Sequence, residues 1–108
     1  MKIAVSATGD SMSAQVSEQF GRCAYFLIVD SETMEFEPIT NPGMGMMGGA
    51  GPEAAKQIAN RGANVVLTGS VGPNAKAALD SAGINIVTGI SGTKTVKEAV
   101  QDYIKGEK

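Results

Sequence analysis

Short apolar runs separated by glycine turns and amphipathic stretches dominate this chain. Residues 2–7 are apolar and short, which predicts a buried strand. Residues 24–29 are aromatic and β-branched and give the strongest strand signal. Residues 34–40 alternate apolar and acidic side chains and contain Pro38, so they predict an edge strand paired with 24–29 in a hairpin. Two further short runs complete five predicted strands, at 64–68 and 84–88.

Three amphipathic stretches predict helices. Pro52 and Pro73 stand at the expected first positions of two of them, and Gly62 and Gly83 follow their ends. The third stretch begins with a capping box, a Thr and a Glu three residues apart. The apolar residues at helical spacing are Ala54, Ala55, Ile58 and Ala59 in the first stretch, Ala75, Ala78, Leu79 and Ala82 in the second, and Val96, Ala99, Val100 and Tyr103 in the third, which starts at Thr95-Val96-Lys97-Glu98.

A fourth, shorter helix is predicted between the first two strands. Ser13 would cap it, Val16 and Phe20 lie four residues apart as on one helical face, and Gly21 would end it.

The order of these elements indicates an α/β fold with a mostly parallel sheet covered on both faces, in which the hairpin supplies one antiparallel strand. If the first strand runs parallel to the third, fourth and fifth, four loops open at the carboxyl edge of the sheet, where such sheets bind ligands. Arg22 and Cys23 would enter the antiparallel strand at the same edge. The four loops are residues 8–13, 41–51, 69–73 and 88–94.

Length and charge narrow the class of protein. With 108 residues, we expect a single domain over 1–108. The 9 basic and 11 acidic side chains form no run of like charge, which argues against nucleic acid or a membrane surface as partner. No basic-apolar leader and no apolar run of about 20 residues is present, so we expect a cytoplasmic protein without a membrane partner.

A glycine and methionine loop carries the first candidate chemistry. Residues 43–52 hold five glycines and three methionines, which predicts a flexible loop leading into a helix N-terminus. Backbone N–H groups and the helix dipole favour an anion there, and thioethers are soft donors for copper(I) and metal-sulfur species. Alternatively, the methionines fill gaps in the core. The turn at 69–74 is a second candidate anion site, or simply a helix start.

Enzymatic chemistry lacks candidate residues. The chain has no histidine, and Cys23 is its only cysteine, by default a small buried hydrophobe. The first and fourth predicted strands contain no carboxylate for a two-metal nuclease. Residues 8–11 faintly resemble a flavodoxin phosphate loop, but Asp10 would repel a phosphate and no tryptophan is present to flank a flavin. We therefore expect no enzyme.

Several motifs together resemble the dinitrogenase iron-molybdenum cofactor biosynthesis family, over nearly the whole chain. They are Phe20-Gly21-Arg22-Cys23-Ala24-Tyr25-Phe26 before an apolar strand ending at Asp30, Gly48-Gly49-Ala50-Gly51 opening a helix, Gly69-Ser70-Val71-Gly72-Pro73-Asn74-Ala75, and Ala82-Gly83-Ile84. The resemblance implies a ribonuclease H-like, three-layer α/β/α fold. Its five-stranded mixed sheet would have the order 3-2-1-4-5, with strand 2 antiparallel.

The resemblance also implies a small non-catalytic carrier or accessory protein for a metal-sulfur cluster of the molybdenum-copper sulfide or iron-molybdenum type, held non-covalently. Because histidine is absent, this chain is more similar to the small stand-alone members that hold a molybdenum-copper sulfide cluster. Implied partners are cofactor-assembly proteins or nucleotide-dependent ATPases, and we expect a monomer. The alternative is a non-catalytic adaptor or regulatory module that uses the Met/Gly loop as a docking surface.

We expect backbone amides to hold the cluster, because the chain offers few metal donors. Arg22 would add a charge-assisted contact. The candidates for direct metal contact are Met44, Met46, Met47 and Cys23. The full set of expected cluster-binding residues is Thr8, Gly9, Arg22, Cys23, Met44, Met46, Met47, Gly48, Gly49, Ala50, Gly51, Ser70, Val71, Gly72 and Asn74.

Overall fold

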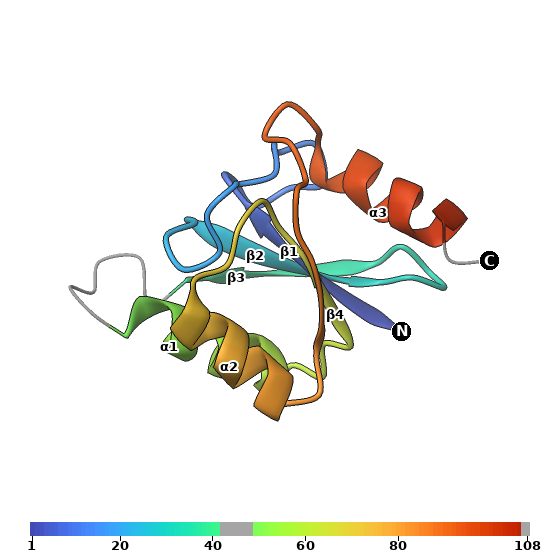
Figure 1. Ribbon diagram of the computed structural model, residues 1–108. Helices are drawn as coiled ribbons and strands as arrows, with labels where there is room; N and C mark the ends of the chain where they lie inside the picture. The colour runs from blue at the N-terminus through green and yellow to red at the C-terminus, as the bar shows by residue number, and fades with distance from the viewer. Residues whose placement is uncertain (42–48, 107–108) are drawn as a thin grey trace.

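A five-stranded mixed sheet forms the middle layer of the computed structural model, which describes residues 1–41 and 49–106 (Figure 1). The strand order is β3-β2-β1-β4-β5. β2 is antiparallel to both of its neighbours, whereas β1, β4 and β5 are mutually parallel. The predicted sheet order and the antiparallel second strand are therefore confirmed. The strands are β1 (Lys2–Ala7), β2 (Tyr25–Asp30), β3 (Phe36–Thr40), β4 (Val65–Leu67) and β5 (Asn85–Val87).

Helices cover both faces of the sheet. α1 (Ala50–Asn60) and α2 (Pro73–Ser81) lie together on one face, and α3 (Val96–Gly106) lies on the other (Figure 1). Alternate residues of β1, β2 and β4 enter separate cores, as the two-residue period of a strand requires. Ala4, Phe26, Ile28 and Val66 pack with α1 and α2, and Ile3, Val5, Leu27, Val29, Val65 and Leu67 pack with α3. The predicted three-layer α/β/α fold is confirmed.

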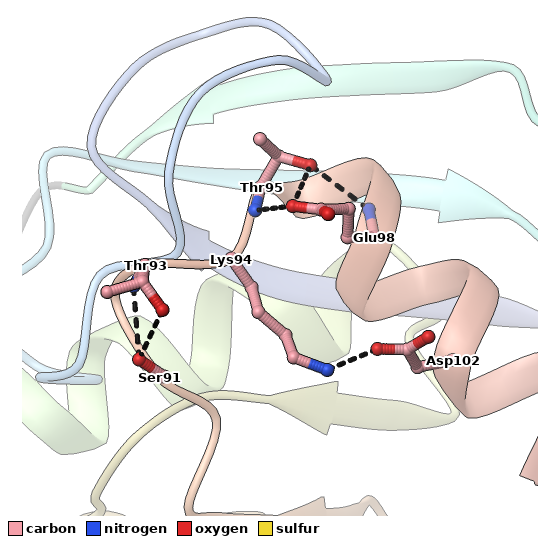
Figure 2. Close-up of polar contacts among 6 residues, drawn as sticks. All are labelled: Ser91, Thr93, Lys94, Thr95, Glu98 and Asp102. Carbon is pink, nitrogen blue, oxygen red and sulfur yellow. Dashed lines mark hydrogen bonds and ion pairs between the residues drawn. The ribbon is translucent and has the colours of Figure 1, made fainter.

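The capping box of α3 forms as predicted (Figure 2). The Thr95 N–H donates to Glu98 Oε1 at 2.9 Å, and the Glu98 N–H donates to Thr95 Oγ1 at 3.2 Å. These two bonds satisfy N–H groups that a helix start leaves without an intrahelical partner. Lys94 pairs with Asp102 beside the cap, but both side chains are about half exposed, so solvent screens this pair.

The predicted helix over 13–20 is wrong, because this segment is irregular, forms only isolated β-bridges and bonds to neighbouring loops. The Val16 N–H donates to the Lys94 carbonyl at 2.9 Å, and the Phe20 N–H donates to the Ser70 carbonyl at 3.2 Å. Val16 packs in the α3 core, whereas Phe20 packs in the α1/α2 core. The four-residue spacing of Val16 and Phe20 therefore does not mark a helical face. It arises because the chain crosses the edge of the sheet between them and places one side chain in each core.

The helix boundaries differ slightly from the predictions. α1 begins at Ala50, so Pro52 is its third residue and Gly51 belongs to the helix rather than to the loop. Proline is tolerated there because the first four N–H groups of a helix have no intrahelical acceptor. Ala82 is the exposed C-cap residue of α2 rather than part of its buried face. Among the described residues, no helix has the length and apolar composition needed to cross a bilayer.

Candidate functional site

The N-terminal ends of α1 and α2 lie side by side at the carboxyl edge of β1 and β4, close to the loop that precedes β2 (Figure 1). A pocket of about 270 Å³ opens between them. The two helix starts, which the sequence indicates as candidate anion sites, therefore line one pocket. The pocket is lined by Gly21, Arg22, Gly49, Ala50, Gly51, Pro52, Gly72, Pro73, Asn74 and Ala75.

Glycines allow the three segments around the pocket to approach closely. A Cβ atom on Gly51 would lie 2.7 Å from the Cβ of Ala75, which is closer than real Cβ contacts allow. A Cβ atom on Gly21 would lie 3.2 Å from the backbone N and Cα of Gly51. The turn before β2, the start of α1 and the start of α2 are thus in near backbone contact. Larger residues at these positions would push the segments apart and widen the pocket.

The electrostatics of the pocket favour an anion. Gly49 and Gly72 are the N-cap residues of α1 and α2, and neither helix has a side-chain hydrogen bond at its cap. The N–H groups of both first turns are therefore not used by a capping side chain, and both helix dipoles point their positive ends at the same space. Of the described residues that line the pocket, Arg22 alone carries a charge, and it is exposed.

A buried asparagine supports the turn that carries Arg22. Asn41 is only 6% exposed, and its Nδ2 donates to the carbonyls of Gly21 and Cys23 at 3.0 and 2.9 Å. The Cys23 thiol donates to the Phe20 carbonyl at 3.3 Å and lies beneath the same turn. Burial raises the pKa of the Cys23 thiol to about 12, so it stays protonated at neutral pH and lacks the thiolate that a metal prefers.

A second set of contacts fixes the segment before the turn against the start of α2. The Ser70 N–H and Oγ donate to the Glu18 carbonyl at 2.7 and 3.1 Å. The backbone at Gly69 runs so close that a Cβ there would lie 2.6 Å from the Cα and carbonyl oxygen of Glu18. Because residues 18–20 lead directly into Gly21, these contacts help to place the turn beside α2.

The structure brings six of the predicted site residues together in this pocket and places five elsewhere, and the remaining four lie outside the described residues. Arg22, Gly49, Ala50, Gly51, Gly72 and Asn74 line the pocket. Thr8 and Gly9 belong to the loop after β1, where Thr8 Oγ1 donates to the Gln15 carbonyl at 3.2 Å. Ser70 lines a different hollow of about 350 Å³ with Glu18, Val71 packs against the core, and Cys23 is buried. Met44, Met46, Met47 and Gly48 lie outside the described residues.

Several residues of the site were absent from the set of expected cluster-binding residues, although Pro52, Gly69 and Pro73 belong to the two stretches predicted as candidate anion sites. Gly21, Pro52, Pro73 and Ala75 line the pocket, and Asn41 and Gly69 shape its walls from outside. Gly21 directly precedes Arg22, and the two prolines mark helix starts, so local patterns point to these three. No local pattern identifies Asn41, because its partners lie about 20 residues earlier in the chain.

A larger hollow of about 490 Å³ lies along the edge strand β3. Glu37 and Arg61 line it and pair with each other, and Asp10 also lines it, so its charge is net negative and disfavours an anion. No helix N-terminus lines it, because its helical residues come from the middle and the C-terminal end of α1. Its size alone is therefore a weaker indication of function than the chemistry of the smaller pocket.

The described residues offer no ligand set for a bare metal ion. Within 1–41 and 49–106, no group of three or more Cys, Asp and Glu side chains is close enough to hold one. What this part of the chain presents is backbone N–H groups and a guanidinium. Such donors suit a ligand that brings its own negative charge.

The fold and the site define a class of small three-layer α/β/α protein with an anion-suited pocket at the carboxyl edge of its sheet. The family described as "Dinitrogenase iron-molybdenum cofactor" matches residues 1–106, and the chain belongs to this family. The resemblance noted from the sequence motifs is thus confirmed.

Individual proteins agree with this assignment. The apo form of the orange protein from Desulfovibrio gigas superposes with a TM-score of 0.93 at 42% identity, over 98% of this chain and 88% of that chain. A Thermotoga protein named as a candidate NifB protein has a TM-score of 0.83 at 30% identity, over 97% of this chain and 88% of that chain. An uncharacterized protein of Methanocaldococcus jannaschii is 31% identical over 99% of this chain and 88% of its own length.

Proposed function

We propose that this protein is a non-catalytic carrier that binds a preassembled, anionic metal-sulfur cluster in the pocket between the N-termini of α1 and α2. The observation that carries the proposal is the convergence of two helix starts without side-chain caps beside Arg22. Membership of the cofactor family supports a cargo of this kind. Resemblance to the small stand-alone members favours a molybdenum-copper sulfide cluster over an iron-molybdenum one.

A cluster that carries its own sulfide ligands fits this pocket better than free metal ions do. The sulfides accept hydrogen bonds from backbone N–H groups and from the Arg22 guanidinium, so no protein-metal bond is required. Cys23 is an unsuitable ligand, because it is buried and protonated. The proposed binding residues are those that line the pocket. Direct metal contact by Met44, Met46 or Met47 stays a prediction, because these residues lie outside the described part of the chain.

The expected affinity suits a carrier. Each helix N-terminus contributes about 0.3–1 kcal/mol toward an anion, rising to about 2 kcal/mol where it is partly buried. A hydrogen bond from a charged group such as Arg22 contributes about 1.5–3 kcal/mol. Two helices and Arg22 together correspond to dissociation constants no tighter than about 10 μM. Binding of this strength is reversible, as delivery to a cofactor-assembly partner requires.

Reconstitution tests the proposal. The protein, at a concentration above the expected dissociation constant, is dialysed to equilibrium against tetrathiomolybdate and copper, and the bound metals and the visible charge-transfer bands are then measured. We expect molybdenum and copper to remain bound in wild type and to decrease in Arg22→Gln. Lys105→Gln removes an equal charge from α3, on the other face of the sheet, and should bind as wild type does. A colourless, metal-free wild-type product would overturn the proposal and favour the adaptor alternative.

A further inference from the structure

Asn41 occupies an unusual position for a polar side chain, since it is buried and lies outside the pocket. It follows the last residue of β3, Thr40, directly and precedes the residues that lead to α1. Its backbone N–H donates to the Ala24 carbonyl at 3.1 Å, which extends the pairing of β2 and β3 by one step. The backbone of Asn41 is therefore fixed to the sheet.

The side chain of Asn41 reaches from this fixed point to the turn before β2. A primary amide has two N–H donors, and the two short contacts of Nδ2 go to the carbonyls of Gly21 and Cys23, one on each side of Arg22. A third, weaker contact of 3.8 Å joins Nδ2 to the Cys23 sulfur. The amide therefore ties the carbonyl groups of the residues before and after Arg22 to the end of β3.

Asparagine is well suited to this task. An aspartate of the same shape would present only acceptors to two carbonyl oxygens, and an alanine would leave both carbonyls without this donor. Gly21, which the amide holds, also touches the backbone of Gly51 at the start of α1. A shift of the turn would therefore change both the position of Arg22 and the width of the pocket.

We infer that Asn41 is a positioning residue for the proposed cluster site, which holds the carbonyl groups of Gly21 and Cys23, the residues before and after Arg22, so that the guanidinium and the Gly21 backbone stay in place for an anionic cluster. This inference rests on the proposed function. Asn41 acts through the turn and does not contact the cargo. Asn41 differs from the core residues in its expected effect: its replacement should change the geometry of the site more than it lowers the free energy of unfolding.

The test combines a dynamic measurement on the apo protein with a double-mutant cycle. In Asn41→Ala we expect the ¹⁵N order parameters of Gly21, Arg22 and Cys23 to fall from about 0.85 toward 0.6, while those of β1 stay unchanged. Val100→Ala removes buried side-chain volume from the α3 core and serves as the destabilised control. It should leave the order parameters of the turn at wild-type values.

The cycle measures binding of tetrathiomolybdate with copper. Replacement of a supporting residue commonly costs about 10–100-fold in affinity, and we expect about tenfold for Asn41→Ala and about tenfold for Arg22→Gln. If Asn41 acts by placing Arg22, the double variant should also lose only about tenfold rather than a hundredfold. Asn41→Ser keeps one donor, should show an intermediate loss, and replaces Asn41→Ala in the cycle if the alanine variant does not fold.

Two binding results would overturn the inference while the proposed function stands. One is wild-type binding together with unchanged affinity in the Asn41 variants, and the other is a double variant whose losses multiply. Unchanged order parameters in the turn would also overturn it. If wild type itself binds no cluster, the proposed function fails and the inference falls with it.

Discussion

Replacing Gly51 by alanine tests the close approach of α1 and α2 that forms the pocket. An alanine inside a helix is normally better than glycine by about 0.5–1 kcal/mol, so helix propensity alone predicts that Gly51→Ala stabilises the protein. In the structure, however, the added Cβ would lie 2.7 Å from the Cβ of Ala75, which is attached directly to the α2 backbone. The two helices would have to move apart, since no side-chain rotation relieves the overlap.

Steric overlap should outweigh propensity here. Overpacking of this kind costs about 1–3 kcal/mol, and a residue at the second position of a helix gains less from propensity than one in the middle. We therefore expect Gly51→Ala to lower the free energy of unfolding by about 1–2 kcal/mol and to weaken cluster binding. Moving the methyl group across the interface, as in Gly51→Ala with Ala75→Gly, should recover at least about 1 kcal/mol relative to the sum of the single changes.

Urea unfolding followed by circular dichroism measures each term of this cycle. Gly106→Ala is a matched control, because a Cβ at that α3 residue meets no atom within 4 Å. We expect no loss of stability in the control. A Gly51→Ala variant more stable than wild type, with no coupling to Ala75, would show that the helices are not in contact at these residues.

Three further predictions concern residues around the site and in α3. Gly69→Ala should lower the free energy of unfolding by about 1–3 kcal/mol, measured by urea unfolding, because the added Cβ would overlap the Glu18 backbone; wild-type stability would contradict this contact. Burial raises the pKa of the Cys23 thiol from 9.0 to about 12. We therefore predict that its contribution to stability is complete below pH 9 and is lost as the pH rises toward 12. Cys23→Ala should flatten this part of the pH dependence, and an unaltered slope would refute its assignment to Cys23. Thr95→Ala should cost about 1 kcal/mol through loss of the α3 cap, and an unchanged urea midpoint would argue against the capping box.

Local patterns were sufficient to predict most of the fold. The apolar runs located the five strands and the capping box located the start of α3, whereas the strand order 3-2-1-4-5 came from the family resemblance. The helix predicted over 13–20 failed because Val16 and Phe20 have helical spacing but belong to opposite cores. A spacing rule contains no information about which face of the sheet each side chain meets.

The site was predictable only in part, because its walls depend on contacts between distant segments. Glycine and proline at the helix starts identified two of the three segments, and Arg22 at the entry to the antiparallel strand identified the third. The overlap at Gly51 depends on Ala75, and the hydrogen bonds of Asn41 reach back to Gly21 and Cys23. These contacts arise only once the strands have brought the loops together, so no short motif marks them.

A two-dimensional ¹⁵N NMR titration of the apo protein with tetrathiomolybdate and copper tests the central claim most directly. If the cluster binds between the two helix starts, the largest shifts should fall on the amides of Gly21, Arg22, Gly51 and Asn74, which line the pocket. Amides of α3 should scarcely move. Shifts concentrated along β3 and Arg61, at the larger hollow, or an unchanged spectrum at millimolar cluster would contradict the proposed site.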